Sequence, residues 1–353
     1  MTFGAHHYVP VLKVKRGEKA ALTEIARPLR QRITPLLEIV TRTGEKTIEG
    51  HLDTAFKGLA DSTRPYGRCF LDAHELGGDG PDAAEKVFRR ASSEGIVFTP
   101  VTGISRTADV EAVLQHSAEG IALRLTRQEF QDGRLASGIQ GFITTHDLSP
   151  GSVDLIIDLG PVDDMVKAGV IALAAAFMAA VPDHVQWRTF TVSACAFPKG
   201  MAGVERWSHD GVERVDWVAW RDGLQARRHK LARLPAFSDG AIQHPSGVEG
   251  FEFGKYQVSA SIRYALSDAW LRIKGESTKS SPLTAQFPKL ASALVRGQFR
   301  QEFSGPEHCT GCEAMARAAD GAPRLGSLEV WRRLGTIHHV STVMQALAAL
   351  SWS

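Results

Sequence analysis

Residues 8–40, YVPVLKVKRGEKAALTEIARPLRQRITPLLEIV, contain the pattern on which the fold prediction depends. Two short apolar runs, 8–14 and 33–40, flank a stretch whose apolar residues recur at helical spacing. A nearly continuous apolar run of this length is typical of a parallel strand that is buried on both faces. The segment therefore predicts a strand, a crossover helix and a second strand parallel to the first.

The same unit recurs along the chain. Seven strand-like runs start 25 to 34 residues apart, and the five that follow the opening segment are 66–73, 95–103, 120–126, 153–160 and 187–197. No G-x-G-x-x-G or G-x-x-x-x-G-K-[ST] sequence follows the first run, which disfavours an open dinucleotide-binding sheet. Seven successive β/α units instead predict an α/β fold that closes as a (β/α)8, TIM-barrel-like barrel.

The eighth strand has two candidates, residues 235–245 and 258–266. We favour 235–245, because Trp217, Trp220 and Leu224 in 212–232 fall at i, i+3 and i+7 and predict the seventh crossover helix just before it. The later segment is then an appended β-hairpin. The expected organisation is a barrel over 1–255, a hairpin and loop over 256–285, and a C-terminal helical extension packed on the barrel over 286–353.

Composition restricts the class of protein. The chain is 43% hydrophobic with a net charge of +2, so no global charge demands nucleic acid or a membrane surface as partner. The longest apolar run, 170–181, is shorter than the roughly 20 residues of a membrane span. The N-terminus has no signal-peptide pattern, and four scattered cysteines do not form a secreted disulfide framework. We expect a reduced, cytoplasmic protein without a membrane partner.

Charged and polar side chains occupy the carboxyl ends of most predicted strands. They are Lys13 and Lys15, Glu38, Asp72 with His74 just beyond it, Arg124, Asp158, Ser193 and Asp239. In a β/α barrel these ends meet at one mouth, where the active sites of this fold are located. An isolated buried charge costs several kcal/mol, so we expect these residues to face one another, water or a ligand across a shared polar pocket.

This mixture of acids and bases suits a divalent metal with phosphate ligands. Glu38, Asp72 and Asp158 are predicted to hold a cation such as Mg²⁺ and to act in catalysis, with His74 as general acid or base. Substrate binding is assigned to Lys13, Lys15, Arg124, Ser193, Asp239 and Arg263. The plainer alternative is that strand-end charges are only hydrated or paired with helix residues, and no H-E-x-x-H sequence selects a reaction.

The sequence EHCTGCEAM places Cys309 and Cys312 at C-x2-C spacing, with His308 beside them and His338 and His339 further on. A structural zinc site needs four such ligands. Successive residues of a helix point about 100° apart, so His338 and His339 cannot both bind one ion. We therefore interpret this region as a cysteine-containing loop packed near a histidine-bearing helix, and zinc is not expected.

Several stretches together resemble the Beta protein family, and they occur in the same order over most of the chain. They are YVPVLKVKRGE, ITPLLEI, AFPKG (196–200), SDGAIQHP, IRYALSDAWLRIKG and the W-x6-HH pattern of Trp331, His338 and His339. Two positions depart from the family's pattern. Cys312 follows Gly311 where relatives tend to have an acid, and Gly240 follows Asp239 where an aromatic residue is frequent. The first departure counts against a zinc site shared by the family.

The resemblance implies a barrel-like α/β fold and a role, with neighbouring gene products, in the conflict between bacteria and phages. It implies no settled activity. Two hypotheses follow. The first is a metal-assisted phosphodiesterase or related hydrolase that acts on a nucleotide or nucleic acid. The second is a non-catalytic sensor or partner subunit that recognises a phage product or docks an effector encoded by a neighbouring defence gene.

Overall fold

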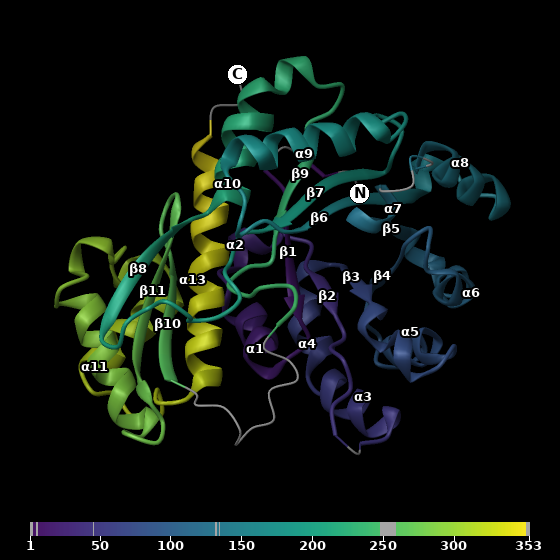
Figure 1. The fold of residues 1–353 in the computed structure, drawn as a ribbon. Helices are drawn as coiled ribbons and strands as arrows, with labels where there is room; N and C mark the ends of the chain where they lie inside the picture. The colour runs from purple at the N-terminus through teal and green to yellow at the C-terminus, as the bar shows by residue number, and fades with distance from the viewer. Residues whose placement is uncertain are drawn as a thin grey trace.

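The computed structural model describes residues 3–4, 6–44, 46–130, 133, 135–247 and 259–350. Eight parallel strands close into a barrel, which confirms the predicted TIM-barrel-like α/β fold (Figure 1). In order around the barrel they are β1 (Tyr8–Lys13), β2 (Leu36–Glu38), β3 (Cys69–Asp72), β4 (Phe98–Thr102), β5 (Ile121–Thr126), β6 (Val153–Pro161), β7 (Thr189–Cys195) and β9 (Ala236–Asp239).

Helices follow the strands and cover the outside of the barrel (Figure 1). They are α1 (Arg16–Glu24), α2 (Arg27–Arg30), α3 (Ile48–Phe56), α4 (Leu59–Thr63), α5 (Ala83–Ser93), α6 (Thr107–Gln115), α7 (Arg127–Phe130), α8 (Leu135–Thr145), α9 (Lys167–Ala180) and α10 (Val215–Ala219). The predicted seventh crossover helix is confirmed as α10, which continues through a π-helical turn, η5 (Trp220–Leu224), and a 3-10 turn, η6 (Gln225–Lys230).

The barrel interior is apolar in its middle and polar at both ends. Its central layer consists of Val9, Leu36, Phe70, Val101, Ala122 and Ile156. At the amino-terminal end of the strands, the buried Asp154 carboxylate accepts hydrogen bonds from Arg68 Nη1 (2.8 Å) and Thr189 Oγ1 (2.7 Å). Charged side chains thus pair below the apolar layer, while the carboxyl-terminal end holds the candidate site.

The eighth strand lies where we predicted it. β9 falls within 235–245 and pairs in parallel with both β7 and β1, which closes the barrel. The alternative segment forms β10 (Ser259–Ala265), which pairs antiparallel with β11 (Ala269–Ser277). The predicted hairpin is therefore confirmed, although its first residues, 256–258, and the predicted domain boundary at 255 lie outside the described residues.

The hairpin belongs to a second sheet that includes a strand we did not predict. The strand order is β10-β11-β8, and β8 (Ser208–Glu213) is contributed from within the expected barrel segment, between β7 and β9. Three helices pack with this sheet: α11 (Leu283–Val295), α12 (Thr310–Ala319) and α13 (Leu328–Ala349). We call this sheet with α11 and α12 the C-terminal lobe. The apolar face of the hairpin is buried in the lobe core.

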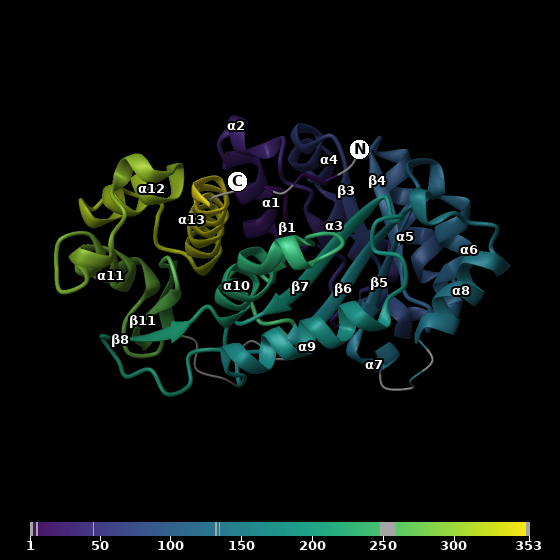
Figure 2. The same cartoon turned by 90° about the horizontal axis from the view of Figure 1, so that it is seen from above.

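Helix α13 lies between the lobe and the barrel (Figure 2). On one side it contacts β10 of the lobe, and on the other it contacts α1 and β1 of the barrel. Among the described helices, none combines the length and apolarity that a membrane span requires.

Candidate functional site

The strand-end charges converge at the barrel mouth. Strand register places Lys13 beside Glu38, and Glu38 beside Asp72, because β1, β2 and β3 end at the same level. The Arg124 side chain reaches this group from β5, and Asp158 reaches it from β6. The five residues therefore form one network at the barrel mouth; Lys13, Glu38, Arg124 and Asp158 line the pocket there, whereas Asp72 is buried beneath it and does not.

Arg124 is the centre of the cluster. Its guanidinium donates to Glu38 Oε1 at 2.7 Å, to Asp72 Oδ2 at 2.8 Å and to Asp158 Oδ2 at 2.8 Å. Such charge-assisted hydrogen bonds are stronger than neutral ones, and the planar guanidinium can serve several carboxylates at once. One arginine therefore binds all three predicted metal ligands.

Two residues that we did not assign complete the ion-pair network. Lys13 Nζ pairs with Glu38 Oε2 at 3.0 Å and also with Glu75 from the 3-10 turn η2 (His74–Asp79). Arg106, in the loop before α6, donates to Asp72 Oδ1 at 2.8 Å. Neither residue lies in a strand, so the strand-end pattern gave no signal for them.

Turn geometry fixes the two aspartates. The Asp72 carboxylate accepts the backbone N–H of His74 at 3.0 Å, and that of Asp158 accepts the backbone N–H of Gly160 at 2.8 Å. An aspartate that bonds the backbone two residues ahead forms a local turn at the strand end. In both residues Oδ1 accepts the backbone N–H and Oδ2 accepts a hydrogen bond from the Arg124 guanidinium, so both carboxylates are held in place.

The pairing also fixes the charge states. Burial alone would raise the pKa of Asp72, but Arg106 and Arg124 outweigh it and lower that pKa to about 2. The pKa of Glu38 is likewise lowered, since Arg124 and Lys13 outweigh burial. Burial alone would lower the pKa of Lys13, yet Glu38 and Glu75 raise it above its ordinary value. These shifts favour the ionised forms of Asp72, Glu38 and Lys13 at neutral pH.

These residues do not fit the expected Mg²⁺ site. A hard divalent cation needs free carboxylate oxygens directed at one point. Here the point shared by Glu38, Asp72 and Asp158 is taken by the Arg124 guanidinium, which already neutralises them. Among the described residues, the three carboxylates do not form a group with the close ligand spacing of a metal site. No chemical step is therefore assigned to a metal here.

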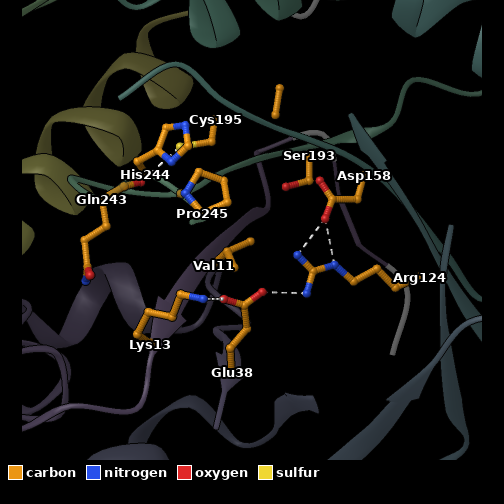
Figure 3. A pocket seen from close by; sticks show the side chains of 12 residues that line it. Val11, Lys13, Glu38, Arg124, Asp158, Ser193, Cys195, Gln243, His244 and Pro245 are labelled. Carbon is orange, nitrogen blue, oxygen red and sulfur yellow. Dashed lines mark hydrogen bonds and ion pairs between the residues drawn. The ribbon is translucent and has the colours of Figure 1, made fainter. Parts of the chain in front are cut away.

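A pocket opens above the network (Figure 3). It encloses about 360 Å³ not filled by atoms, part of it open solvent. Lys13, Glu38, Arg124 and Asp158 form one side, and the loop after β9 contributes Gly240, Gln243, His244 and Pro245 to the other (Figure 3). Ser193 lines the pocket, and its hydroxyl accepts a hydrogen bond from Ser238 at 3.0 Å.

His244 is a pocket residue that we did not assign. Its Nε2 lies 3.5 Å from Asp163 Oδ1, and its Nδ1 accepts the backbone N–H of Ser246 at 3.1 Å. Because Nδ1 accepts, Nε2 carries the proton of the neutral ring and points to the carboxylate. The segment SDGAIQHP contained this histidine, but its position after the predicted strand gave no reason to select it.

Two predicted residues lie near the mouth but outside the pocket. His74 is exposed and contributes only its backbone N–H to the network. Lys15 lies beyond the end of β1, at the N-cap of α1, and does not line the pocket. The structure therefore does not place either side chain where it was expected.

Asp239 and Arg263 lie behind the barrel wall rather than in the pocket. Asp239 is 0% exposed and shares the outward face of β9 with Phe237. It accepts hydrogen bonds from Tyr8 Oη (2.5 Å) and His339 Nε2 (2.9 Å), which connects the barrel to α13. Arg263, on β10, donates to the carbonyl of Ile242 at 2.7 Å and stacks over Phe197. Both residues hold the lobe and α13 against the barrel.

Comparison with known protein families gives a match to the Beta protein family over residues 8–345. No curated protein and no solved structure matches the chain. The matched region contains every barrel strand, the lobe and most of α13. Because this match covers nearly all of the 353 residues, the chain belongs to the Beta protein family.

Proposed function

We propose that this chain is a non-catalytic recognition subunit of a bacterial or prophage anti-phage defence system, and that its barrel-mouth pocket binds a small ligand that signals infection. The defence role rests on the resemblance to Beta proteins, which occur in phage-defence gene clusters. In this role the chain acts in the cytoplasm with the product of a neighbouring defence gene.

The proposal depends on one observation: the acids predicted to perform catalysis are already paired. Glu38 bonds to Lys13 and Arg124, and Asp72 bonds to Arg106 and Arg124. A carboxylate held ionised between two cations is a poor general acid or base at neutral pH, because catalysis requires a pKa near the working pH. A rigid, preorganised charge network suits selective binding instead.

Charge balance indicates the class of ligand. In the network four carboxylates (Glu38, Asp72, Glu75 and Asp158) meet three cations (Lys13, Arg106 and Arg124), which leaves one negative charge in excess. A phosphate would have to displace a carboxylate from its cation and would meet this negative excess. The pocket therefore favours a neutral or cationic ligand with hydrogen-bond donors.

Filling the pocket should abolish phage protection without unfolding the chain. Val11, half-buried on β1, lines the pocket, so Val11→Trp should occupy ligand space and lower protection at least tenfold in a plating assay. The control is Val97→Trp, at a valine that is 47% exposed, which should protect normally. Co-purification of the neighbouring gene product should persist in both variants. Full protection by Val11→Trp, with its melting temperature unchanged, would contradict a role for the pocket.

The hydrolase, without a metal, remains the second candidate, because His244 and Ser193 both line the pocket and His244 Nε2 lies 3.5 Å from Asp163 Oδ1. Recognition predicts that His244→Asn retains protection within about threefold, since shape and polarity are kept, whereas general acid–base catalysis contributes about 10²–10⁴-fold. The matched control is His229→Asn, at an exposed histidine of η6. Loss of protection in His244→Asn alone, together with a thermal shift of the wild type by inorganic phosphate or AMP, would favour the hydrolase.

A further inference from the structure

The C-x2-C sequence at the start of α12 lies beside two histidines. Within the described part of the chain, His308, Cys309 and His338 form a group whose ligand atoms all lie within 4.8 Å of one another. Cys312 is outside this group of three but adjoins it, because its Sγ lies 3.2 Å from His338 Nδ1 and its backbone N–H donates to Cys309 Sγ at 3.3 Å. Two cysteines and two histidines thus come together from the 3-10 turn η8 (Pro306–His308), the start of α12 and the middle of α13.

We propose that these four side chains form a structural Zn²⁺ site with an S2N2 ligand set. Two thiolates and two imidazoles in tetrahedral geometry select zinc among the common divalent metals. Ligand atoms about 2.0–2.3 Å from a tetrahedral ion lie about 3.3–3.8 Å apart, so the ligand atoms of His308, Cys309 and His338 need to approach one another by roughly 1 Å. His308 and Cys309 are half-buried, and rotation of their side chains can supply this movement.

The tautomer of His338 is already the one that metal binding requires. Its Nε2 lies 2.8 Å from the carbonyl oxygen of Ala265, which can only accept, so Nε2 carries the proton. The lone pair of Nδ1 therefore points toward Cys312 Sγ. Metal-bound histidines usually donate their other ring N–H to a carbonyl or carboxylate in this way. The ring of Tyr264 stacks on His338 at 3.7 Å and fixes its orientation.

The cysteines are also held as thiolate ligands would be. The backbone N–H of Cys312 donates to Cys309 Sγ at 3.3 Å, and Cys309 is the N-cap residue of α12. The positive end of a helix dipole stabilises a thiolate at this position. The hydroxyl of Tyr264 lies 3.5 Å from Cys312 Sγ and can donate to a thiolate there. His308 Nε2 lies 3.1 Å from Thr342 Oγ1, which holds this ring against α13.

The ion would fasten the lobe to α13. His338 faces the lobe, while the adjacent His339 faces the barrel and bonds Asp239. The expectation that these two histidines cannot share one ion is thus consistent with their opposite roles. With four protein ligands the site has no open position for substrate, so the metal stabilises the fold rather than reacting.

The test uses the full chain purified after expression in zinc-supplemented medium. Elemental analysis should find one zinc per chain, and Cys309→Ser/Cys312→Ser should hold less than a tenth of that. Cys69→Ala, at a buried cysteine of β3 outside the group, is the matched control and should keep one zinc. Substoichiometric zinc in the wild type, or equal zinc in the double variant and the control, would overturn the proposal.

A second measurement tests the zinc site even if the Cys309→Ser/Cys312→Ser variant does not fold. Wild-type chain stripped of metal and loaded with Co²⁺ should show a thiolate-to-cobalt charge-transfer band and the strong visible bands of a tetrahedral site. His308→Ala, at a half-buried surface turn, should fold and bind Zn²⁺ at least about tenfold more weakly in chelator competition. Absence of the thiolate band, or a Cys309–Cys312 disulfide in the freshly isolated chain, would contradict the proposal.

Discussion

Replacing Arg124 with methionine is expected to lower the free energy of unfolding by about 3–5 kcal/mol at pH 7. Methionine keeps most of the side-chain volume but removes the cation that Glu38, Asp72 and Asp158 share. Breaking a buried ion pair from one side leaves uncompensated charge in a region of low dielectric constant. Urea denaturation with linear extrapolation measures the loss.

Arg64→Met is the matched control for this substitution. Arg64 is 77% exposed and pairs with Asp61 at 3.3 Å on the surface, where an ion pair contributes less than about 1 kcal/mol. The two variants should therefore differ by several kcal/mol. If both variants lost the same free energy of unfolding, the carboxylates at the barrel mouth would be solvated. The network would then not be a preorganised binding site.

The pH dependence separates lost charge pairing from lost packing. In the wild type the pKa of Asp72 is lowered to about 2 from an ordinary value of 3.8, so its contribution is present above about pH 4 and is lost as the pH falls toward 2. In Arg124→Met the carboxylates lose their main cation, and burial then raises their pKa values. The deficit of the variant should therefore shrink as the pH falls from 7 to 5. A deficit that is constant over this range would indicate a packing defect instead.

Asp239→Ala is expected to lower the free energy of unfolding by about 3–5 kcal/mol, rather than to weaken ligand binding selectively. Asp239, His339 and Arg214 are all 0% exposed. Asp239 accepts from His339 at 2.9 Å, and Arg214 Nη2 lies 3.9 Å from its carboxylate. Without Asp239 the buried Arg214 loses this carboxylate, and α13 loses the hydrogen bond between His339 and Asp239. Thermal and urea denaturation measure the effect.

Asp164→Ala provides the control for this second substitution, because Asp164 is exposed on the loop after β6 and should change stability by less than about 0.5 kcal/mol. If the Asp239→Ala protein is stable but fails to protect against phage, the predicted role of Asp239 in ligand binding would be supported. A destabilised one would support its structural role.

The strands and the mouth cluster could be predicted because they depend on local pattern and on one rule of the fold. Each strand is a buried apolar run, and Lys13, Glu38 and Asp72 directly end such runs. Parallel strands of a barrel place their carboxyl ends together. The ion pairs among these side chains depend on distances that the spacing of residues in the sequence does not reveal. For the same reason the sequence could not show that Glu38, Asp72 and Asp158 are bound to Arg124 and lack the geometry of a metal site.

Asp239 shows why position along a strand was insufficient. Residues of β9 are buried on both faces, since one face lines the barrel and the other is covered by Trp217 and Trp220 and, at Asp239, by α13. The apolar pattern of AFSD therefore does not reveal that Ser238 faces inward and Asp239 outward. A shift of one residue moves a side chain to the opposite face of a strand. Strand β8 was not predicted because it is not an apolar run. Its sequence, SHDGVE, is mostly polar, and its residues alternate between half-buried and exposed.

The sequence by itself determined the barrel, the place of its eighth strand, the hairpin and the strand-end charges Lys13, Glu38, Asp72, Arg124 and Asp158, because these follow from periodicity and from the rule that parallel barrel strands end at one mouth. Only the tertiary structure decided which charges neutralise one another and which cysteines and histidines adjoin. Arg124 and Glu38, or Cys312 and His338, become neighbours through long-range packing, and such packing depends on the shape of the whole chain rather than on any local pattern.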